Sequence, residues 1–173
     1  SYHEYNEIQK ADELVTQLKN GTNIALVSDA GTPGISDPGY RLVKAVHNAK
    51  IPVSVVPGPS SITAAMSISG LPTDHFYFEG FLPKKKGRLT RMKFLATLPS
   101  TVIIFESPVR VIKTLGHIQT HFGDRIISVC REMTKMHEEV FRGTIWKTMN
   151  HFREKPSIKG EIVILIAKEG YEE

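Results

Sequence analysis

Apolar residues recur at helix and strand spacing along the first 72 residues. The segment from Glu4 to Lys19 carries its apolar residues on one face and ends at Asn20-Gly21, which predicts an amphipathic helix. Two short apolar runs each lead through a turn into a helical pattern, and such pairs of strand and helix indicate a parallel sheet. The strands are expected at Ile24–Val27 and Ile51–Val56, and the helices at Tyr40–Val46 and Ile62–Ile68.

From residue 73 onward, apolar runs again alternate with turns and helical segments. A helix ends before Gly70-Leu71-Pro72, and the next run has the aromatic, alternating pattern of a strand. We therefore predict an α/β chain with a domain boundary between residues 72 and 73, so that residues 73–173 form a second α/β domain. Strands are expected at His75–Phe81, Thr101–Phe105, Ile126–Cys130 and Gly160–Ala167, and helices at Val111–Phe122 and from Thr144 to about Glu154.

Size and composition describe a globular chain. It has 173 residues, of which 40% are hydrophobic, and this is enough to bury a core. No apolar run approaches the roughly 20 residues that span a bilayer, and the first residues lack the basic and apolar regions of a signal peptide. These features predict a cytoplasmic location and no association with a membrane.

Charge and cysteine content add two expectations. Lysine and arginine exceed aspartate and glutamate by 22 to 18, and the resulting net charge of +4 fits an anionic partner without requiring one. The single cysteine, Cys130, lies in an apolar run, which favours a buried structural thiol over a nucleophile. Nothing in the sequence predicts a disulfide or a metal site.

Two turns have the composition of ligand-binding loops. The first, Ser28–Gly39, contains three glycines, two prolines and two aspartates, and it is longer than most connections between a strand and a helix. The second, Pro57–Ser61, opens the next helix, where Ser60 and Ser61 serve either as helix caps or as ligand contacts. Both turns should lie at the carboxyl edge of the parallel sheet. Ordinary connections use the same residue types, so a purely structural role stays the alternative.

Two further segments concentrate charge. Six of the ten residues from Lys84 to Lys93 are basic, and Pro83 and Gly87 make the first half of this segment a loop. Such a run is either a solvated face or a clamp on the phosphates of a nucleic acid. The segment Arg131–Gly143 interleaves charged residues directly after an apolar run, which indicates either simple ion pairs or a functional site.

Five motifs in register along essentially the whole chain carry a family resemblance. In this order and spacing they resemble the bacterial 16S ribosomal RNA cytidine 2′-O-methyltransferases of the tetrapyrrole methylase superfamily. The motifs are Ser28–Gly39, Pro57-Gly58-Pro59-Ser60, Gly80-Phe81-Leu82-Pro83, Glu106-Ser107-Pro108 with Arg110, and Arg131-Glu132-Met133-Thr134-Lys135.

The resemblance implies a homodimeric enzyme that methylates a cytidine ribose of 16S ribosomal RNA in the small ribosomal subunit. It also implies two α/β domains, with a parallel sheet in the first and a mixed sheet in the second, and S-adenosylmethionine (SAM) in a cleft between them. Carried over position by position, the cofactor-binding residues would be Asp29, Ala30, Thr32 and Ile35 of the first turn, Ser60 and Ser61 of the second, and Phe105, Thr134 and Gly160 of the second domain.

One departure from the family pattern concerns the start of the chain. Family members begin with a glycine-containing strand and loop that forms one wall of the cofactor site, whereas this chain starts after that element. The resemblance therefore implies that residues 1–72 are the remainder of an N-terminal domain whose first strand and loop are missing. Such a piece is expected to bind SAM less well and to expose a sheet edge.

The implied chemistry is an in-line attack of the ribose 2′-oxygen on an activated methyl group. Glu106, Glu132 and Lys135 are the candidate catalytic residues, because each lies in a motif at a strand end and could take the hydroxyl proton or orient the ribose. Arg110 and Arg131 are expected to hold flanking phosphates through bidentate contacts. More remote contacts with RNA are expected from Lys84, Lys85, Lys86 and Arg88.

Two other function classes stay open. A methyltransferase acting on a small tetrapyrrole would share the cofactor turns, although the basic loop argues against it. A non-catalytic RNA-binding module would keep the basic residues without using SAM. Activity that is insensitive to salt would favour the first alternative, and failure of the full-length protein to bind SAM would favour the second.

Overall fold

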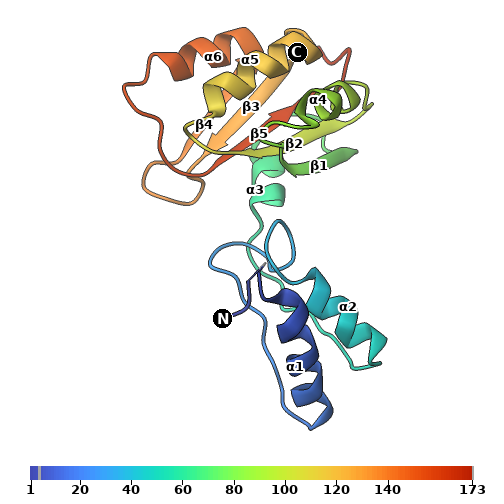
Figure 1. Ribbon diagram of the computed structural model, residues 1–173. Coiled ribbons are helices and arrows are strands. Elements are labelled where there is room, and N and C mark those ends of the chain that lie inside the picture. The colour runs from blue at the N-terminus through green and yellow to red at the C-terminus, as the bar shows by residue number, and fades with distance from the viewer. Residues whose placement is uncertain (4, 173) are drawn as a thin grey trace. The chain divides into compact units, whose positions relative to one another are not determined.

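The computed structural model describes residues 1–3 and 5–172, and Figure 1 shows the order of the elements along the chain. The chain divides into two compact units, an N-terminal unit of Ser1–Ser60 and a C-terminal unit of Ser61–Glu173. They are described separately below. Within the described residues, no helix has both the length and the apolar character needed to cross a membrane.

The N-terminal unit consists of two helices with long connections. Helix α1 spans Glu7–Lys19 and helix α2 spans Tyr40–Asn48. They pack side by side, because their apolar faces share a small core built on Ala11, Leu42 and Val46. Both predicted helices are therefore confirmed, although the predicted first residue of α1, Glu4, lies outside the described residues.

The predicted parallel sheet of residues 1–72 is wrong for this structure. None of the described residues in that range lies in a strand. The two apolar runs expected to be strands, Ile24–Val27 and Ile51–Val56, are single segments without a paired neighbour, and the side chains of Val27 and Val56 are 82% and 90% exposed. An apolar run becomes a strand only when another segment supplies the ladder of backbone hydrogen bonds.

The C-terminal unit is built on a five-stranded mixed sheet in the order β1-β2-β5-β3-β4. Strands β1 and β2 are parallel, and every other neighbouring pair is antiparallel. The mixed sheet predicted for the second domain is thereby confirmed. The strands span Phe76–Phe81 (β1), Thr101–Glu106 (β2), Ile126–Arg131 (β3), Glu139–Thr144 (β4) and Ile162–Ile166 (β5).

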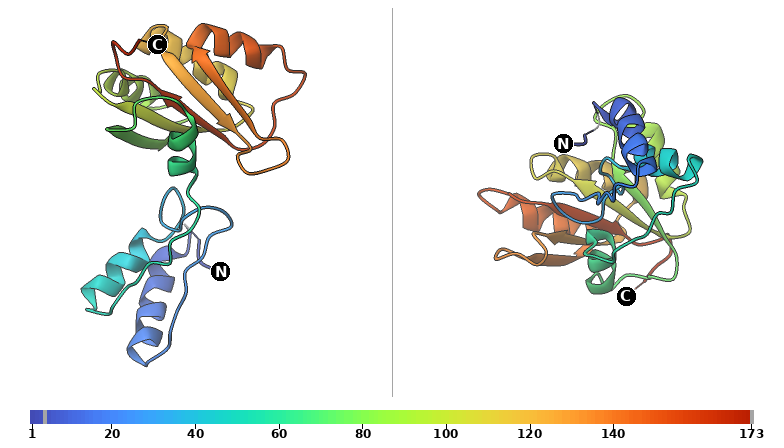
Figure 2. Two further views of the ribbon diagram at one scale, coloured as in Figure 1. Left: turned by 180° about the vertical axis from the view of Figure 1, so that it is seen from behind. Right: turned by 90° about the horizontal axis from the view of Figure 1, so that it is seen from below.

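Strand β4 was missed in the sequence. It pairs with β3 to form a hairpin at one side of the sheet, which Figure 2 shows from behind. Its residues EVFRGT alternate in character but contain two charged residues, so the segment looked like part of a charged loop. Charged residues are common on edge strands because they discourage pairing with a second molecule.

Helices cover the two faces of this sheet unequally (Figure 1). Helices α4 (Arg88–Ala96), α5 (Val111–Phe122) and α6 (Ile145–Arg153) lie on one face, and α3 (Ser61–Ile68) lies on the other. Alternate residues of β2 serve the two cores, since Val102 and Ile104 pack under α4–α6 whereas Ile103 packs with α3. This explains why the central strands are continuous apolar runs.

Helix termini match the sequence in several places. Helix α5 has the predicted bounds, and Thr144 caps α6 by accepting a hydrogen bond from the Lys147 amide at 3.3 Å. The basic segment is a loop up to Gly87, as predicted, and then continues as α4, which was not predicted. The compact units meet before α3, whereas the predicted domain boundary lies after it, so the domain assignment and the cofactor cleft stay predictions.

Candidate functional site

The two glycine- and proline-rich turns meet within the N-terminal unit. The Thr32 hydroxyl donates a hydrogen bond to the Pro59 carbonyl at 3.0 Å and so joins the turn Ser28–Gly39 to the turn that ends at Ser60. Gly31 and Gly34 have positive φ, and a side chain added at either position would meet nothing within 4 Å. The backbone of the first turn is therefore open to a bound molecule.

The predicted cofactor residues of this unit lie on the surface of the joined turns. Asp29, Ala30 and Ile35 are exposed, and Thr32 and Ser60 are half-buried. Asp29 has no hydrogen-bond or ion-pair partner among the described residues, so both of its carboxylate oxygens are available to a ligand. The oxygen atoms of Asp29 and Thr32 can accept hydrogen bonds from the hydroxyl or amino groups of a small molecule.

A buried glutamate fixes the end of the first turn. Glu7, the first residue of α1, accepts hydrogen bonds from the Gly39 amide and from the Arg41 guanidinium, each at 3.1 Å. A side chain at Gly39 would be crowded, because an added Cβ would lie 3.1 Å from the Gly34 amide nitrogen. The sequence analysis treated Glu7 only as part of an amphipathic helix, since nothing local marks a contact 32 residues away.

In the C-terminal unit, the predicted residues gather where β2 and β3 end and β5 begins, which we call the carboxyl edge. The register pairs Ile162 of β5 with both Glu106 of β2 and Arg131 of β3. Residues next to these three positions in the sequence, including Phe105 and Gly160, therefore share this edge. Three segments that are far apart in the chain, two of them carrying the Glu106 and Arg131 motifs, come together here.

Glu106 lies at the centre of a buried polar network. Its side chain has no exposed surface; one oxygen accepts from the Ser107 amide and the Arg110 guanidinium, at 2.7 and 2.8 Å. The other oxygen accepts from the Thr114 hydroxyl at 2.6 Å and lies 3.7 Å from Arg88. All its lone pairs are directed at the protein, so in this conformation Glu106 holds β2, α4 and α5 together.

Glu132 and Lys135 tie the loop after β3 to the start of β5. Glu132 has a positive φ of 50° and accepts hydrogen bonds from the Glu161 amide at 2.8 Å and from Lys135 at 3.1 Å. Gly160 has a φ of 91°, and a Cβ at that position would lie 2.2 Å from the Glu132 carboxyl carbon, so a side chain there would strain the backbone and displace Glu132. Hydrogen bonds from Lys135 to Glu132 and Glu161 raise the pKa of Lys135, so its ammonium stays protonated at neutral pH.

A second acidic centre, Glu139, was not singled out from the sequence. Its carboxylate contacts Arg131 at 2.9 Å, His151 at 2.7 Å and Lys155 at 2.8 Å. Burial by itself would raise the pKa of Glu139, but hydrogen bonds from Lys155, His151 and Arg131 outweigh it and lower the pKa to about 2. Because Arg131 also donates to the Lys159 carbonyl, this cluster positions the start of the loop.

The predicted RNA-binding residues differ in exposure and in whether their charges are paired within the protein. Lys84, Lys85 and Lys86 are exposed and have no ion-pair or hydrogen-bond partner among the described residues. Arg88 is mostly buried; it donates to the Pro83 carbonyl and the Thr114 hydroxyl. Arg110 and Arg131 are also paired internally, with Glu106 and Glu139. Of these six predicted residues, only the three lysines present charge to solvent without a partner in the described part of the chain.

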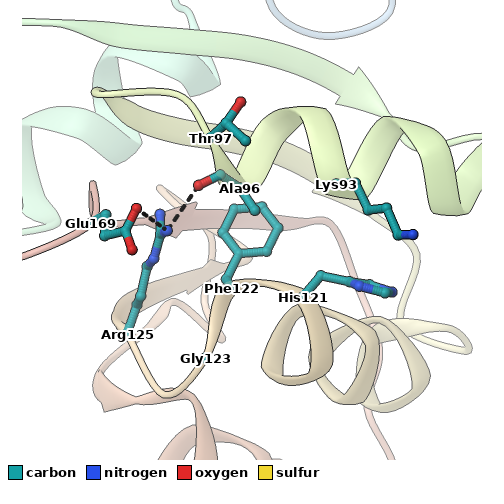
Figure 3. A pocket seen from close by; sticks show the side chains of 8 residues that line it. All are labelled: Lys93, Ala96, Thr97, His121, Phe122, Gly123, Arg125 and Glu169. Atoms are coloured by element: carbon teal, nitrogen blue, oxygen red, sulfur yellow. Dashed lines mark hydrogen bonds and ion pairs between the residues drawn. The ribbon is translucent and has the colours of Figure 1, made fainter.

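A cavity of about 490 Å³ lies at the opposite edge of the sheet, away from these residues (Figure 3). Arg125 reaches across it to the Ala96 carbonyl at 2.8 Å and to Glu169 at 3.6 Å. Lys93 stands in the last turn of α4, where the helix dipole favours its positive charge, and His121 stands in the last turn of α5. The helix end therefore explains the position of Lys93, and the contacts with Ala96 and Glu169 explain that of Arg125.

Cys130 is buried, as the sequence predicted. Burial raises the pKa of its thiol to about 11, and the sulfur lies 3.9 Å from the Ser128 hydroxyl. A thiol with so high a pKa is not a nucleophile at neutral pH.

Comparison with protein families gives a match along most of the chain. The model of the family Tetrapyrrole (Corrin/Porphyrin) Methylases matches residues 2–147. Among curated proteins, the chain is 43% identical to "Ribosomal RNA small subunit methyltransferase I" of Thermotoga maritima, over 96% of this chain and 75% of that protein. It is 46% identical to the protein of the same name from Synechocystis, over 96% of this chain and 60% of that protein.

Length distinguishes the chain from several of these relatives. It spans 60% of the Synechocystis protein and 57% of the corresponding protein of Mesorhizobium japonicum, to which it is 45% identical.

Solved structures show the same fold at low sequence identity. The methyltransferase CobJ superposes with a TM-score of 0.70 at 17% identity, over 96% of this chain and 73% of that chain. The uroporphyrin-III C-methyltransferase of Thermus thermophilus, solved in complex with S-adenosylhomocysteine, gives a TM-score of 0.60 at 17% identity, over 95% and 74% of the two chains. These likenesses concern the α/β fold alone.

Proposed function

The chain belongs to the tetrapyrrole methylase family, and from that premise we propose that it serves SAM-dependent 2′-O-methylation of a cytidine ribose in 16S ribosomal RNA. The observation that carries the proposal is the identity to curated small-subunit RNA methyltransferases, which extends over nearly the whole chain. The substrate is then the small ribosomal subunit or its RNA.

The joined turns of the N-terminal unit fit a SAM-binding role. When bound, SAM supplies an activated methyl group on a sulfonium. Asp29 and Thr32 offer oxygen atoms for its ribose or amino groups, while Ala30, Ile35 and Ser60 line the same surface. Open space beside Gly31 and Gly34 lets a ligand approach the backbone closely. Ser61, Phe105, Thr134 and Gly160 are the further proposed contacts.

Catalysis of this displacement depends chiefly on placing the ribose oxygen in line with the methyl group. Such positioning supplies roughly 7 to 11 kcal/mol of a barrier, whereas a general base adds about 10²- to 10⁴-fold in rate. We propose that Glu132 and Lys135 orient the ribose, because both stand in the surface loop at the carboxyl edge and Lys135 is 45% exposed. The fixed positions of Glu132 and Gly160 pre-organise this loop.

Glu106 has a different proposed role. A base that takes the hydroxyl proton must reach the substrate, and the Glu106 carboxylate is enclosed by Arg88, Arg110 and Thr114. We propose that it contributes to catalysis by holding the turn between β2 and α5 in place. Arg110 and Arg131 remain the proposed phosphate contacts nearest the reaction.

The unpaired lysines supply the electrostatic attraction for RNA. Lys84, Lys85 and Lys86 lie in the loop after β1. Each phosphate that they neutralise steepens the slope of log binding constant against log salt concentration by about 0.7 to 0.9. We also propose a homodimer in the cytoplasm, as the family resemblance implies. Sedimentation velocity would test the dimer independently of activity.

The decisive experiment is methyl transfer from labelled SAM to isolated small ribosomal subunits, followed by nucleoside analysis of the RNA. The chain would be compared with a version extended to the length of its relatives. A 2′-O-methylcytidine product is expected, with activity that falls steeply as salt rises. SAM binding without any methylated RNA, combined with salt-insensitive methylation of a tetrapyrrole, would overturn the proposal in favour of a small-molecule methyltransferase.

Separate variants test the roles of the residues. Lys135→Ala is expected to lower kcat about 10- to 100-fold with little change in SAM affinity, because it removes an orienting group and not a cofactor contact. Lys168→Ala is the matched control, a lysine of the same unit outside the loop. If Glu132→Gln and Lys135→Ala both leave the turnover of bound substrate unchanged, neither residue orients the ribose.

A further inference from the structure

An exposed aromatic ring stands at the carboxyl edge of the sheet. Phe81, the last residue of β1, is 56% exposed. It packs edge-on against Phe105 with ring centroids 5.6 Å apart, and Phe105 packs in the same way against Phe78 at 4.9 Å. Two rings therefore support the third from behind, and one side of the Phe81 ring stays open to solvent.

A β-bulge decides which side of the sheet Phe81 occupies. The register of β1 against β2 runs from Phe78 opposite Ile103 to Gly80 opposite Ile104, which leaves Glu79 as an extra residue. If Glu79 instead paired regularly with Ile104, alternation along the strand would put Phe81 on the face of Tyr77, beneath α4. The bulge instead brings Phe81 opposite Phe105, on the other face.

The bulge is held firmly on both sides. Gly80 takes a φ of 72°, which only glycine adopts without strain. Glu79 accepts three hydrogen bonds from Arg91 of α4, at 2.6 to 2.8 Å, and Arg91 also contacts the Tyr77 hydroxyl. The exposed position of Phe81 is thus fixed by the bulge and does not result from fraying of the strand end.

Unpaired positive charge follows the ring at once. Lys84, Lys85 and Lys86 begin three residues after Phe81, and the chain between them is anchored because Leu82 is buried and Arg88 binds the Pro83 carbonyl. An aromatic face beside cations is the combination by which proteins hold single-stranded nucleic acid, since bases stack on the ring and phosphates meet the charges. The combination of ring and lysines therefore favours RNA as the occupant.

We propose that Phe81 is a stacking platform for an unpaired nucleobase of the RNA, with Lys84–Lys86 on the flanking phosphates. The proposal rests on the proposed RNA substrate, and it assigns the base contact to a residue outside the predicted catalytic and cofactor sets. Unpaired bases in single-stranded RNA can stack on an aromatic side chain, so the ring would hold the nucleotide to be methylated, or its neighbour, beside the carboxyl edge.

The test measures direct binding, so it does not depend on turnover. A fluorescently labelled single-stranded RNA of about ten nucleotides is titrated with the chain, with Phe81→Ala and with Phe81→Tyr. Loss of the ring is expected to weaken binding about 5- to 150-fold at constant salt while leaving the salt slope unchanged. Phe81→Tyr should retain binding, because it keeps the aromatic face.

Phe76→Ala is the matched control. Phe76 lies on the same strand and is 47% exposed, but it stands at the other edge of the sheet, so its loss should not affect RNA binding. A second readout places Trp at the site, as Phe81→Trp in a Trp146→Phe background. Because Trp146 is the single native tryptophan, the remaining fluorescence then reports on position 81 alone and should be quenched by RNA.

Four outcomes would overturn the proposal. They are equal effects of Phe81→Ala and Phe76→Ala, no RNA binding by the unchanged chain, loss of S-adenosylhomocysteine binding in Phe81→Ala with RNA binding intact, and conversion of a dimer to a monomer with RNA binding intact. The third would place the adenine of the cofactor on the ring, and the fourth would place a second copy of the chain there. Failure of methyl transfer, with the expected RNA binding, would instead count against the proposed function alone.

Discussion

Similar apolar segments are buried in paired strands in the C-terminal unit but are unpaired and largely exposed in the N-terminal unit. In the C-terminal unit, Ile103 and Ile164 lie in strands with neighbours on both sides and have no exposed surface. In the N-terminal unit, the segments Ile24–Val27 and Ile51–Val56 have no strand partner, and Val56 is 90% exposed. Apolar content by itself therefore does not bury a segment. A neighbouring backbone has to satisfy its amides and carbonyls before its side chains can pack.

The largest expected contrast is in amide hydrogen exchange. Amides of β5 are buried in the sheet and should exchange only on unfolding of the C-terminal unit, whereas the amides of the segment Ile51–Val56 need little or no opening. We expect β5 to exchange at least about 1000-fold more slowly, which corresponds to about 4 kcal/mol. Exchange measured by mass spectrometry on peptides from each unit checks this. Equal protection of both regions would show that the extended segments are paired in solution.

Core truncations should sharpen the same comparison. Ile164→Ala removes a fully buried side chain from the sheet and is expected to cost about 2 to 5 kcal/mol. Leu42→Ala in the three-residue core of the N-terminal unit should cost about 2 kcal/mol, because that smaller core can collapse around the loss. Urea unfolding combined with exchange on each unit provides the measurement. Equal loss of protection in β5 from both variants would contradict the division into two units.

Two glycines with similar φ allow the cost of a steric clash to be compared with the cost of backbone strain alone. Gly160→Ala is expected to cost about 3 kcal/mol, because its Cβ would displace the Glu132 side chain in addition to straining a φ of 91°. Gly31→Ala in the N-terminal unit, with a φ of 73° and open space, should cost about 1 kcal/mol. Thermal unfolding of each variant measures the difference.

A double variant tests the cause of that difference. Glu132→Ala added to Gly160→Ala should recover part of the loss, since it removes the displaced side chain. If the double variant is less stable than the sum of its single changes predicts, the Glu132 contact is not the reason.

The smallest effect concerns acid stability of the Glu139 cluster. The folded pKa of Glu139 lies at about 2, below its ordinary value of 4.5, so its contribution is complete above pH 4.5 and is lost as the pH falls toward 2. Glu139→Gln should therefore lower the free energy of unfolding at pH 7 by about 1 to 2 kcal/mol. It should also reduce the loss of stability between pH 4.5 and pH 2. Thermal unfolding between pH 7 and pH 2.5 measures it.

Glu161→Gln serves as the control for this last prediction. Glu161 is 71% exposed, and among the described residues its side chain pairs only with Lys135, so its loss should change stability very little. An unchanged pH profile in Glu139→Gln would show that the cluster does not couple its carboxylate to folding.

Much of the fold could be predicted where local signals and tertiary partners agree. The bounds of α5 and the cap at Thr144 follow from helical spacing and a hydroxyl at the right place. The strand at Ile162–Ile166 follows from an unbroken apolar run. Strand β4 and helix α4 were missed because their exposed faces carry charge, and their assignment depends on neighbours that the local sequence does not reveal.

The sequence by itself determined the family motifs, the basic loop and most elements of the C-terminal unit, since these depend on residue type and spacing along the chain. Only the tertiary structure decided that Glu106 is enclosed, that Glu139 gathers three basic side chains, and that a bulge turns Phe81 toward solvent. Each of these depends on contacts between residues distant in the chain or on the register between strands. Spacing along one segment carries no record of which segment lies beside it.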